Sequence, residues 1–245
     1  MIKKSFLACA VLLALALPAG AQNVFQKDTI STSRGDLTIT FIGHASLMFS
    51  FGGKTIYVDP WGKLADYSTL PKADIVLVTH DHFDHLDRKA LKDVATDRTS
   101  IVITQGCEKQ GVQGIIMKNG DVRTIDGLEI EAVPAYNVVN KRPDGQPFHP
   151  KGTGNGYVIT IGDKRVYVAG DTENIPEMKK LAGIDIAFLP MNLPYTMTSE
   201  MAAEAALAIK PKILYPYHFG DTDTARLVDL LKKNPAIDVR IRKMN

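Results

Sequence analysis

The sequence predicts an α/β protein in which strands and helices alternate along most of the chain. Short runs rich in β-branched residues, bounded by glycine, proline or polar clusters, are typical of strands, and amphipathic helical segments lie between the later runs. The chain has 245 residues, of which 45% are hydrophobic and 23% charged, and it is long enough for one large domain. The same values exclude a disordered chain and a multi-span membrane protein.

Residues 1–21 have the pattern of a secretory signal peptide. Two lysines precede an apolar run over residues 6–17, and small residues up to Ala21 provide a cleavage site. The run is shorter than the roughly 20 residues that a membrane-spanning helix needs. We therefore predict cleavage after Ala21, export across the inner membrane to the periplasm, and a mature chain without a membrane segment. A polar lead-in over residues 22–36 would precede a domain over residues 37–245.

Removal of this peptide takes two of the 29 basic residues, so the mature chain has as many basic as acidic residues. No block of lysine and arginine remains that would bind a polyanion. We therefore expect a small-molecule substrate and no nucleic acid as partner. Cys107 is the only cysteine left after cleavage, so no internal disulfide is expected.

The first half of the mature chain is predicted to hold a β-meander followed by two buried strands. Glycine turns separate the three strands of the meander, at residues 37–42, 46–51 and 55–58. Continuous apolar runs predict strands covered on both faces at residues 74–79 and 101–104, with a short helix between them at residues 88–94.

The second half is predicted to add two hairpins, two further strands and three helices. The hairpins turn at Asp126-Gly127 and at residues 162–164, between strands at residues 122–125, 128–133, 157–161 and 165–168. Further strands are expected at residues 184–189 and 212–217, and helices at residues 175–181, 199–209 and 224–233. The loop over residues 137–155, rich in glycine and proline, has a length that favours a functional role.

Four potential metal ligands follow directly on the buried strand at residues 74–79. The cluster occupies six positions and consists of His80, His82, Asp84 and His85. A strand end that runs into a helical turn can fold these side chains around one small volume. Mixed imidazole and carboxylate ligands are typical of zinc and similar metals, so the cluster predicts a metal site.

Two more candidate ligands lie at strand exits further along the chain. Asp171 follows the strand at residues 165–168, and His218 follows the strand at residues 212–217. Alone, Asp171 would more often be an Asx-turn or helix-cap residue, and His218 would be unremarkable. Beside the histidine cluster they gain weight, because strand exits on one edge of a sheet can share a site.

This set of residues resembles the metallo-β-lactamase superfamily, with its His-x-His-x-Asp-His pattern, a later Asp and a C-terminal His in the same order. The stretches around His44, Asp59 and Asp171, and the compact size, are most similar to the small metal-dependent hydrolases that include relatives of L-ascorbate-6-phosphate lactonase. The resemblance runs from about Leu37 to the C-terminus. It implies a four-layer αββα sandwich with the metal site at one edge, between two β-sheets.

The resemblance also implies roles for the ligands. His80 and His82 would bind a first metal, and Asp171 would bridge it to a second. The second metal would take the remaining three ligands of the set, Asp84, His85 and His218. The cofactor would be one or two Zn²⁺ ions, with Mn²⁺ or Fe²⁺ as alternatives. A metal-bound hydroxide would attack the substrate, and Asp84, as the catalytic residue, or a nearby histidine would handle the proton.

One position departs from the superfamily pattern. A third histidine usually completes the first metal site, but the matching place after the strand at residues 128–133 contains Tyr136 and Asn137. His149, in the long loop, is the one histidine between His85 and Asp171. Either it enters the site as the missing ligand, or fewer groups hold the first metal and a single occupied site performs the hydrolysis.

Three further residues are candidates for supporting roles. His44 either points into the site as a metal, substrate or proton-transfer group or is a turn histidine bonded to the backbone. Asp59 either orients a ligand histidine or fixes its own turn. Asp81 is expected to orient ligands from outside the metal shell.

The leading functional hypothesis is an exported metal-dependent hydrolase that cleaves a small ester, lactone or phosphodiester. A metallo-β-lactamase is an alternative, against which the Tyr136-Asn137 departure argues. A module that binds a metal or ligand without turnover is a second alternative, which the incomplete first site favours. A nucleic-acid-processing enzyme is disfavoured by the neutral mature chain. The same metal core serves many reactions, so the ligands alone do not identify the bond that is cleaved.

Overall fold

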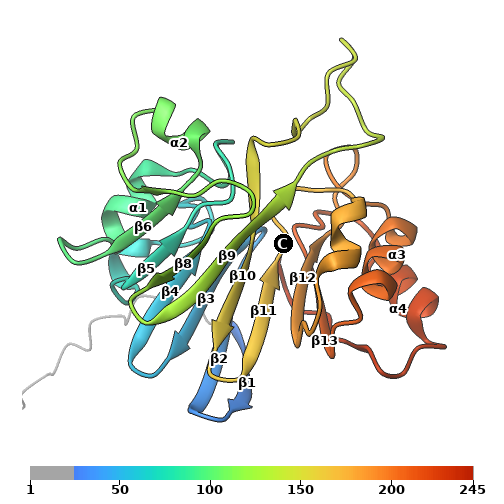
Figure 1. Cartoon of the computed structure of the whole chain (residues 1–245), viewed down its shortest axis with the longest axis horizontal. Coiled ribbons are helices and arrows are strands. Elements are labelled where there is room, and N and C mark those ends of the chain that lie inside the picture. The colour runs from blue at the N-terminus through green and yellow to red at the C-terminus, as the bar shows by residue number, and fades with distance from the viewer. Residues whose placement is uncertain (1–24, 245) are drawn as a thin grey trace, which may run out of the picture.

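The computed structural model describes residues 25–244, so the predicted signal peptide lies outside the described residues. Two seven-stranded sheets pack face to face, and helices cover the outer side of each sheet (Figure 1). This is the four-layer αββα sandwich that the resemblance implied. Within residues 25–244 no helix has both the length and the apolar character needed to cross a membrane.

The first sheet contains the N-terminal strands in sequence order. Its members are β1 (Gln26–Thr32), β2 (Gly35–Gly43), β3 (Ser46–Phe51), β4 (Lys54–Val58), β5 (Ile75–Leu77), β6 (Ser100–Ile103) and β7 (Ile115–Ile116). The predicted meander is confirmed, because β2, β3 and β4 pair antiparallel. From β4 onward the strands run parallel.

Strand β1 forms from the polar segment for which we predicted no strand. It pairs antiparallel with β2 along its whole length at the edge of the first sheet. Only alternate residues are partly buried, and Ile30 is its one large apolar side chain. A strand whose residues are mostly polar has no hydrophobic pattern by which to recognise it, so its pairing partner decides its structure.

The second sheet contains the C-terminal half of the chain. Its members are β8 (Val122–Ile125), β9 (Leu128–Ala135), β10 (Gly154–Ile161), β11 (Lys164–Val168), β12 (Ile186–Pro190), β13 (Ile213–Tyr217) and β14 (Asp238–Val239). Both predicted hairpins are present, since β8 pairs antiparallel with β9 and β10 with β11. Strands β11 to β14 run parallel.

Four α-helices and two 3₁₀ helices connect these strands in the described part of the chain. They are η1 (Tyr67–Thr69), α1 (Arg88–Val94), α2 (Gln105–Lys109), η2 (Pro176–Lys180), α3 (Ser199–Ile209) and α4 (Ala225–Leu231). Helices α1, α3 and α4 agree with the prediction, whereas α2 was not predicted. The helix expected at residues 175–181 is instead the five-residue 3₁₀ helix η2. Short helical connections often take 3₁₀ geometry.

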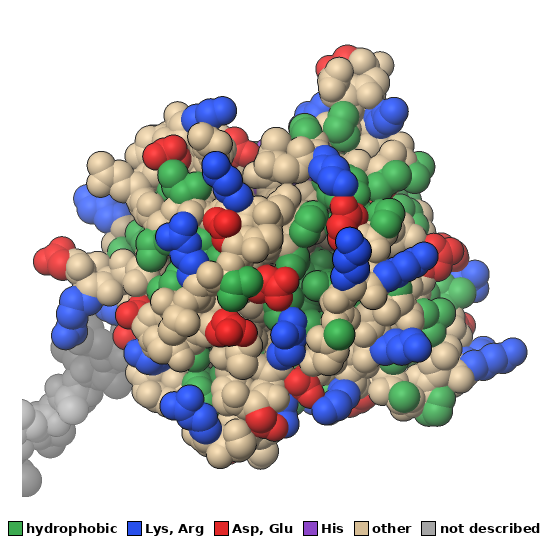
Figure 2. All heavy atoms as spheres, viewed as in Figure 1, with side chains coloured by type: hydrophobic (Ala, Val, Ile, Leu, Met, Phe, Trp, Pro, Cys, Tyr) green, Lys and Arg blue, Asp and Glu red, His purple; other side chains and the backbone are tan. Residues whose placement is uncertain are grey.

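Two apolar layers hold the sandwich together. The larger layer lies between the sheets, where the Phe188 ring packs against Phe49 of the other sheet with a centroid distance of 5.8 Å. The smaller layer lies between the first sheet and α1, and includes Val76, Leu91 and Cys107. On the face seen in Figure 2, acidic and basic side chains are interspersed.

The parallel strands of both sheets end at the same edge of the sandwich. Asp59 follows β4 and His80 lies three residues after β5, while Asp171, Asn192 and His218 follow β11, β12 and β13 at short distance. The loop between β9 and β10, residues 136–153, projects from this edge and is called the arm below (Figure 1). The fold therefore delivers polar side chains from both sheets to one place.

Candidate metal centre

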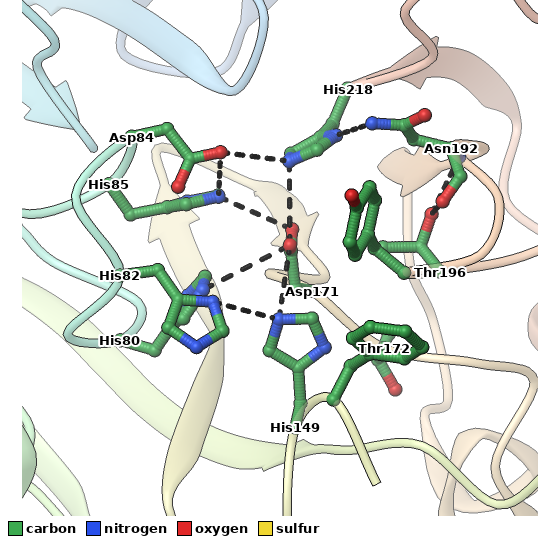
Figure 3. A network of polar contacts seen from close by, with 12 residues as sticks. His80, His82, Asp84, His85, His149, Asp171, Thr172, Asn192, Thr196 and His218 are labelled. Atoms are coloured by element: carbon green, nitrogen blue, oxygen red, sulfur yellow. Dashed lines mark hydrogen bonds and ion pairs between the residues drawn. The ribbon is translucent and has the colours of Figure 1, made fainter. Parts of the chain in front are cut away.

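All six histidines of the chain lie at this edge, together with two aspartates. Figure 3 shows Asp171 in the middle of the other side chains. Within each of three overlapping groups, the possible ligand atoms lie within 4.8 Å of one another. The groups are His44, Asp84, His85 and His218; His80, His82 and His149; and His80, His85 and Asp171.

The turn after β5 brings the candidates of the His-x-His-x-Asp-His segment together. A hydrogen bond from His85 N to His82 O (3.0 Å) folds the backbone back, and the Asp87 side chain then caps α1. As a result the His80 ring lies 4.6 Å from the His82 ring and 4.0 Å from the His85 ring, measured between centroids.

Backbone conformation is unusual at several positions of the site. Gly170 has φ +66°, and a Cβ atom there would lie 2.7 Å from the carbonyl oxygen of Asn155 on β10 and 3.2 Å from Thr79 Cβ after β5, so only glycine fits between these two segments just before Asp171. His44 and His218 have φ values of 50° and 45°, in the left-handed region that non-glycine residues seldom adopt. Backbone strain of this kind concentrates at functional sites.

The first ligand group consists of His80, His82 and His149 beside Asp171. His149 Nε2 lies 3.2 Å from His82 Nδ1 and 3.3 Å from Asp171 Oδ2. His80 Nε2 lies 3.9 Å from the same carboxylate oxygen. The long loop thus brings His149 to the place where the sequence pattern lacked a third histidine.

The second ligand group consists of Asp84, His85 and His218 on the other side of Asp171. Asp171 Oδ1 lies 3.5 Å from His85 Nε2, and Asp171 Oδ2 lies 3.4 Å from His218 Nε2. Asp84 Oδ2 lies 3.9 Å from both imidazole nitrogens. Asp171 therefore faces both groups at once, as a bridging ligand would.

Several buried ligand atoms have no hydrogen-bond partner among residues 25–244. They are the Nε2 atoms of His80, His85 and His218 and the Oδ1 atom of Asp171. Buried polar atoms are almost always paired, so unpaired atoms that converge on one space require an explanation. Imidazole nitrogens and carboxylate oxygens are the ligands that zinc and similar divalent metals take, and cations held by the two ligand groups would satisfy these atoms.

Hydrogen bonds on the far side of the rings fix which nitrogen faces this space. His85 Nδ1 donates to Asp59 Oδ2 at 2.8 Å, and His80 Nδ1 donates to Thr79 Oγ1 at 3.0 Å. Thr79 Oγ1 donates in turn to Asp59 Oδ2 at 2.6 Å. Outer hydrogen bonds of this kind set the tautomer and orientation of metal-bound histidines.

Three of the buried histidine rings are neutral and therefore suited to metal binding. Burial lowers the pKa of His80 well below its ordinary value, and lowers the pKa of His149 and of His218 to about 4. These rings are neutral near pH 7, so each has a lone pair for a metal. Burial also lowers the pKa of His85, but the carboxylates of Asp171 and Asp59 outweigh it and raise that pKa well above the ordinary value.

Two residues that the sequence analysis did not select hold the arm in place. Glu173 is fully buried, and its carboxylate accepts hydrogen bonds from the backbone N of Val138, Val139 and Asn140 at 2.6–2.7 Å. It also accepts from Asn137 Nδ2 at 3.1 Å. In the sequence, the one signal for this role is that Glu173 directly follows Gly170-Asp171-Thr172. Its hydrogen-bond partners lie more than 30 residues away along the chain.

Asn137 links this anchor to His149. Its Oδ1 atom accepts hydrogen bonds from His149 N at 2.7 Å and from His149 Nδ1 at 2.9 Å. The Nε2 atom of His149 is thereby turned toward the first ligand group. Asn137, in the stretch where the sequence lacks the expected third histidine, thus positions a histidine from elsewhere in the chain.

The three supporting candidates have different outcomes. His44 points into the site, where its Nε2 donates to Asp84 Oδ2 at 3.0 Å. Asp59 is fully buried and bonded to His85, as described above. Asp81 does not orient a ligand: its carboxylate packs against Gly106 and accepts from Gln110 Nε2 at 3.2 Å, and within the described residues it bonds no histidine. The exposed side of the turn directs Asp81 toward α2 rather than toward the rings.

Comparison with known proteins assigns the chain to a family. A model of the beta-lactamase superfamily domain matches residues 38–218. A UPF0173 metal-dependent hydrolase from Pelotomaculum thermopropionicum is 30% identical over 222 aligned positions, which cover 84% of this chain and 96% of the relative.

Two solved structures have the same fold. A protein from Parabacteroides distasonis, classed with metal-dependent hydrolases, is 51% identical and has a TM-score of 0.86, with 91% of this chain and 100% of that chain covered. Igni18, a metallo hydrolase from Ignicoccus hospitalis, is 25% identical with a TM-score of 0.70, and 85% and 96% of the two chains are covered. The chain therefore belongs to the metallo-β-lactamase superfamily and, within it, to the UPF0173 family of metal-dependent hydrolases.

Proposed function

We propose that this protein hydrolyses a small ester, lactone or phosphodiester at the edge where the two ligand groups meet. The observation that carries the proposal is the set of four buried, unpaired ligand atoms that converge around Asp171. A module without turnover was favoured only by the incomplete first site. The position of His149 Nε2, 3.3 Å from Asp171 Oδ2, supports a complete first group and therefore favours turnover over this alternative.

Two divalent cations fit this donor set, and we propose Zn²⁺ in both positions. The first would be held by His80, His82 and His149, the second by Asp84, His85 and His218, with Asp171 between them. Bound cations of this kind lower the pKa of a water ligand and polarise a carbonyl or phosphoryl oxygen.

Asp84 is the residue that we propose to handle the proton. Burial raises its pKa, but the hydrogen bond from His44 and the charge of His85 outweigh burial and lower the pKa to about 2. Its carboxylate is therefore ionised at neutral pH, and Oδ2 can accept a proton from the attacking water. In the net reaction the water oxygen bonds to the acyl carbon or phosphorus, the bond to the leaving oxygen breaks, and that oxygen receives the proton. His44, hydrogen-bonded to Asp84, can orient its carboxylate.

The test combines metal content with turnover. Wild type, Asp171→Asn and the exposed Asp97→Asn are analysed for metal per chain and assayed on esters, lactones, phosphodiesters and a β-lactam, before and after chelation. We expect wild type and Asp97→Asn to hold two metals and to hydrolyse one of the first three classes. Asp171→Asn should lose metal and at least about 10³-fold in activity. A metal-free wild type that cannot be reloaded would refute the proposal, and cleavage of the β-lactam alone would favour the lactamase alternative.

We further propose that the protein acts in the periplasm on a small molecule. The support is the basic, apolar and small-residue pattern of residues 1–21. Fractionation of a Gram-negative host that expresses the full chain should recover a product shortened by 21 residues in the periplasmic fraction. Recovery of the full-length chain in the cytoplasm would contradict this.

A further inference from the structure

A cavity of about 360 Å³ opens beside the candidate metal centre. Ligand residues of both groups form its base, among them Asp171. Its opposite wall comes from the arm and from the loop after β12, which supply Arg142, Phe148 and Tyr195. A molecule in this cavity would touch the reacting centre on one side and the arm on the other.

The outer wall of the cavity is aromatic. The Phe148 and Tyr195 rings pack edge to face, with 5.1 Å between their centroids. Phe83 also lines the cavity, and its side chain is 76% exposed. Aromatic side chains held at the rim of a polar site offer a surface for a flat or aliphatic group.

Arg142 is the one basic lining residue of this cavity in the described part of the chain, apart from histidines. Its guanidinium lies over the Phe148 ring at 5.2 Å and donates one hydrogen bond to Phe148 O at 3.3 Å. The Arg142 side chain is exposed, no described carboxylate lies within ion-pair distance of it, and Phe148 O is the one described acceptor of its N–H groups, so most of its five donors are free for a ligand. A planar guanidinium with free donors binds carboxylate and phosphate groups bidentately.

The arm that carries Arg142 is anchored at its root and closed at its tip. Glu173 binds three successive backbone N–H groups at the root, as described above. At the tip, Arg142 N donates to Gln146 O at 2.7 Å and Gly145 N donates to Arg142 O at 2.9 Å. Binding groups held in place in this way lose little conformational entropy when a ligand arrives.

We infer that the substrate has an anionic group, a carboxylate or a phosphate, separated from the scissile bond by a short apolar portion. This inference rests on the proposed hydrolase function. Arg142 binds the anion, and the rings of Phe148 and Tyr195 contact the apolar portion. A second cavity of about 430 Å³, on the other side of His82 and His149, contains Lys109 and is the competing place for the anion.

The test uses three esters that share one leaving group and one acyl chain. The chain ends in a carboxylate, in a phosphonate or in a neutral primary amide. For metal-loaded wild type we expect kcat/KM for an anionic ester to exceed that for the amide at least about tenfold. Arg142→Ala should reduce this preference by about 10- to 100-fold, and Arg142→Lys should restore part of it, because lysine keeps the charge but not the fork. Comparison of the carboxylate ester with the phosphonate ester identifies which anion is preferred.

Two matched variants control for loss of a surface charge. Lys141→Ala removes the neighbouring cation on the same arm, and Lys109→Ala removes the cation of the other cavity; both should keep the wild-type preference. An equal loss on all three esters in Arg142→Ala, or no preference in wild type, would overturn the inference. Loss of the preference in Lys109→Ala would move the anion to the other cavity.

A binding measurement separates this inference from the proposed function. If wild type cleaves none of the esters, that failure concerns the hydrolase proposal. Calorimetric titration with the carboxylate and phosphonate chains that lack the ester then tests the anion site alone. Binding to wild type that weakens at least about tenfold in Arg142→Ala would support the inference, and equal binding to both proteins would refute it.

Discussion

The two ligand groups around Asp171 are built in different ways. The second group is carried by strand exits and by the turn after β5, and its outer support, Asp59, is fully buried in the first sheet. The first group shares that turn but is completed by His149, which comes from an arm of the chain that projects from the sandwich. The Asp171 carboxylate thus lies between a ligand group held by the sheets and a ligand group completed by a loop. We therefore expect substitutions to weaken metal binding more easily at the first ligand group than at the second.

The largest effect should come from the support of the second group. Asp59→Ala leaves Thr79 N, Thr79 Oγ1 and His85 Nδ1 without their buried acceptor. The free energy of unfolding of the metal-free protein should fall by about 3–5 kcal/mol, since the unpaired groups remain in the interior. Urea unfolding measures this. Asp59→Asn, which retains one acceptor oxygen, should lose less, and a loss below about 1 kcal/mol in Asp59→Ala would place the stability elsewhere.

Removal of the loop-borne ligand should separate the two groups. His149→Ala should bind one metal per chain where wild type binds two, because the strand-borne group stays complete. His218→Ala, the matched change in the second group, should lose the other metal. Elemental analysis and titration with a metal-binding dye measure the stoichiometry. Two metals in His149→Ala would mean that two histidines and Asp171 suffice for the first position.

Substitution of Glu173, which anchors the arm, should reduce metal binding less than substitution of His149. Glu173→Gln places an amide NH₂ where a carboxylate oxygen accepts backbone N–H groups, so donors face donors at the root of the arm. Metal affinity of the first position should fall by about 10- to 100-fold, with the second position unchanged. Competition titration against a chelator measures this, and limited proteolysis should cleave residues 137–153 faster. Glu129→Gln, an exposed glutamate on β9 away from the arm, is the control. Equal metal affinities in both variants would show that the Glu173 anchor does not affect metal binding.

The smallest effect should come from Asp28 on β1, at the edge of the first sheet, and concerns the pH dependence of stability. Burial raises the pKa of Asp28, but hydrogen bonds from Arg242 and Tyr215 outweigh it and hold the pKa below its ordinary value. This carboxylate therefore stabilises the fold above its unfolded pKa near about 3.9, and the stabilisation is lost as the pH falls through the lower folded value. Wild type should lose up to about 1 kcal/mol more than Asp28→Asn between pH 5 and pH 3, with metal removed from both. Parallel pH curves would contradict this contribution.

Sequence patterns identified most of the elements and part of the site, and the exceptions share a cause. The continuous apolar run of β5 and the Asp126-Gly127 turn were recognisable because local chemistry determines them. Strand β1 and helix α2 were not, because their residues are polar or few and tertiary pairing decides their structure. Asp81 was placed beside the ligands by its position in sequence, but the turn directs its side chain toward Gln110.

By itself, the sequence determined that a metal site follows β5, since His80, His82, Asp84 and His85 stand within one turn and local backbone geometry brings them together. It also determined the family, through the order of Asp171 and His218 after that cluster. Only the tertiary structure decided that His149 completes the first group, that Asn137 and Glu173 hold it there, and that Arg142 faces the same space. The contacts of His149 with Asn137 and His82 join residues 12 and 67 positions apart. A local sequence pattern does not predict such contacts, because they form only when the two sheets and the arm pack together.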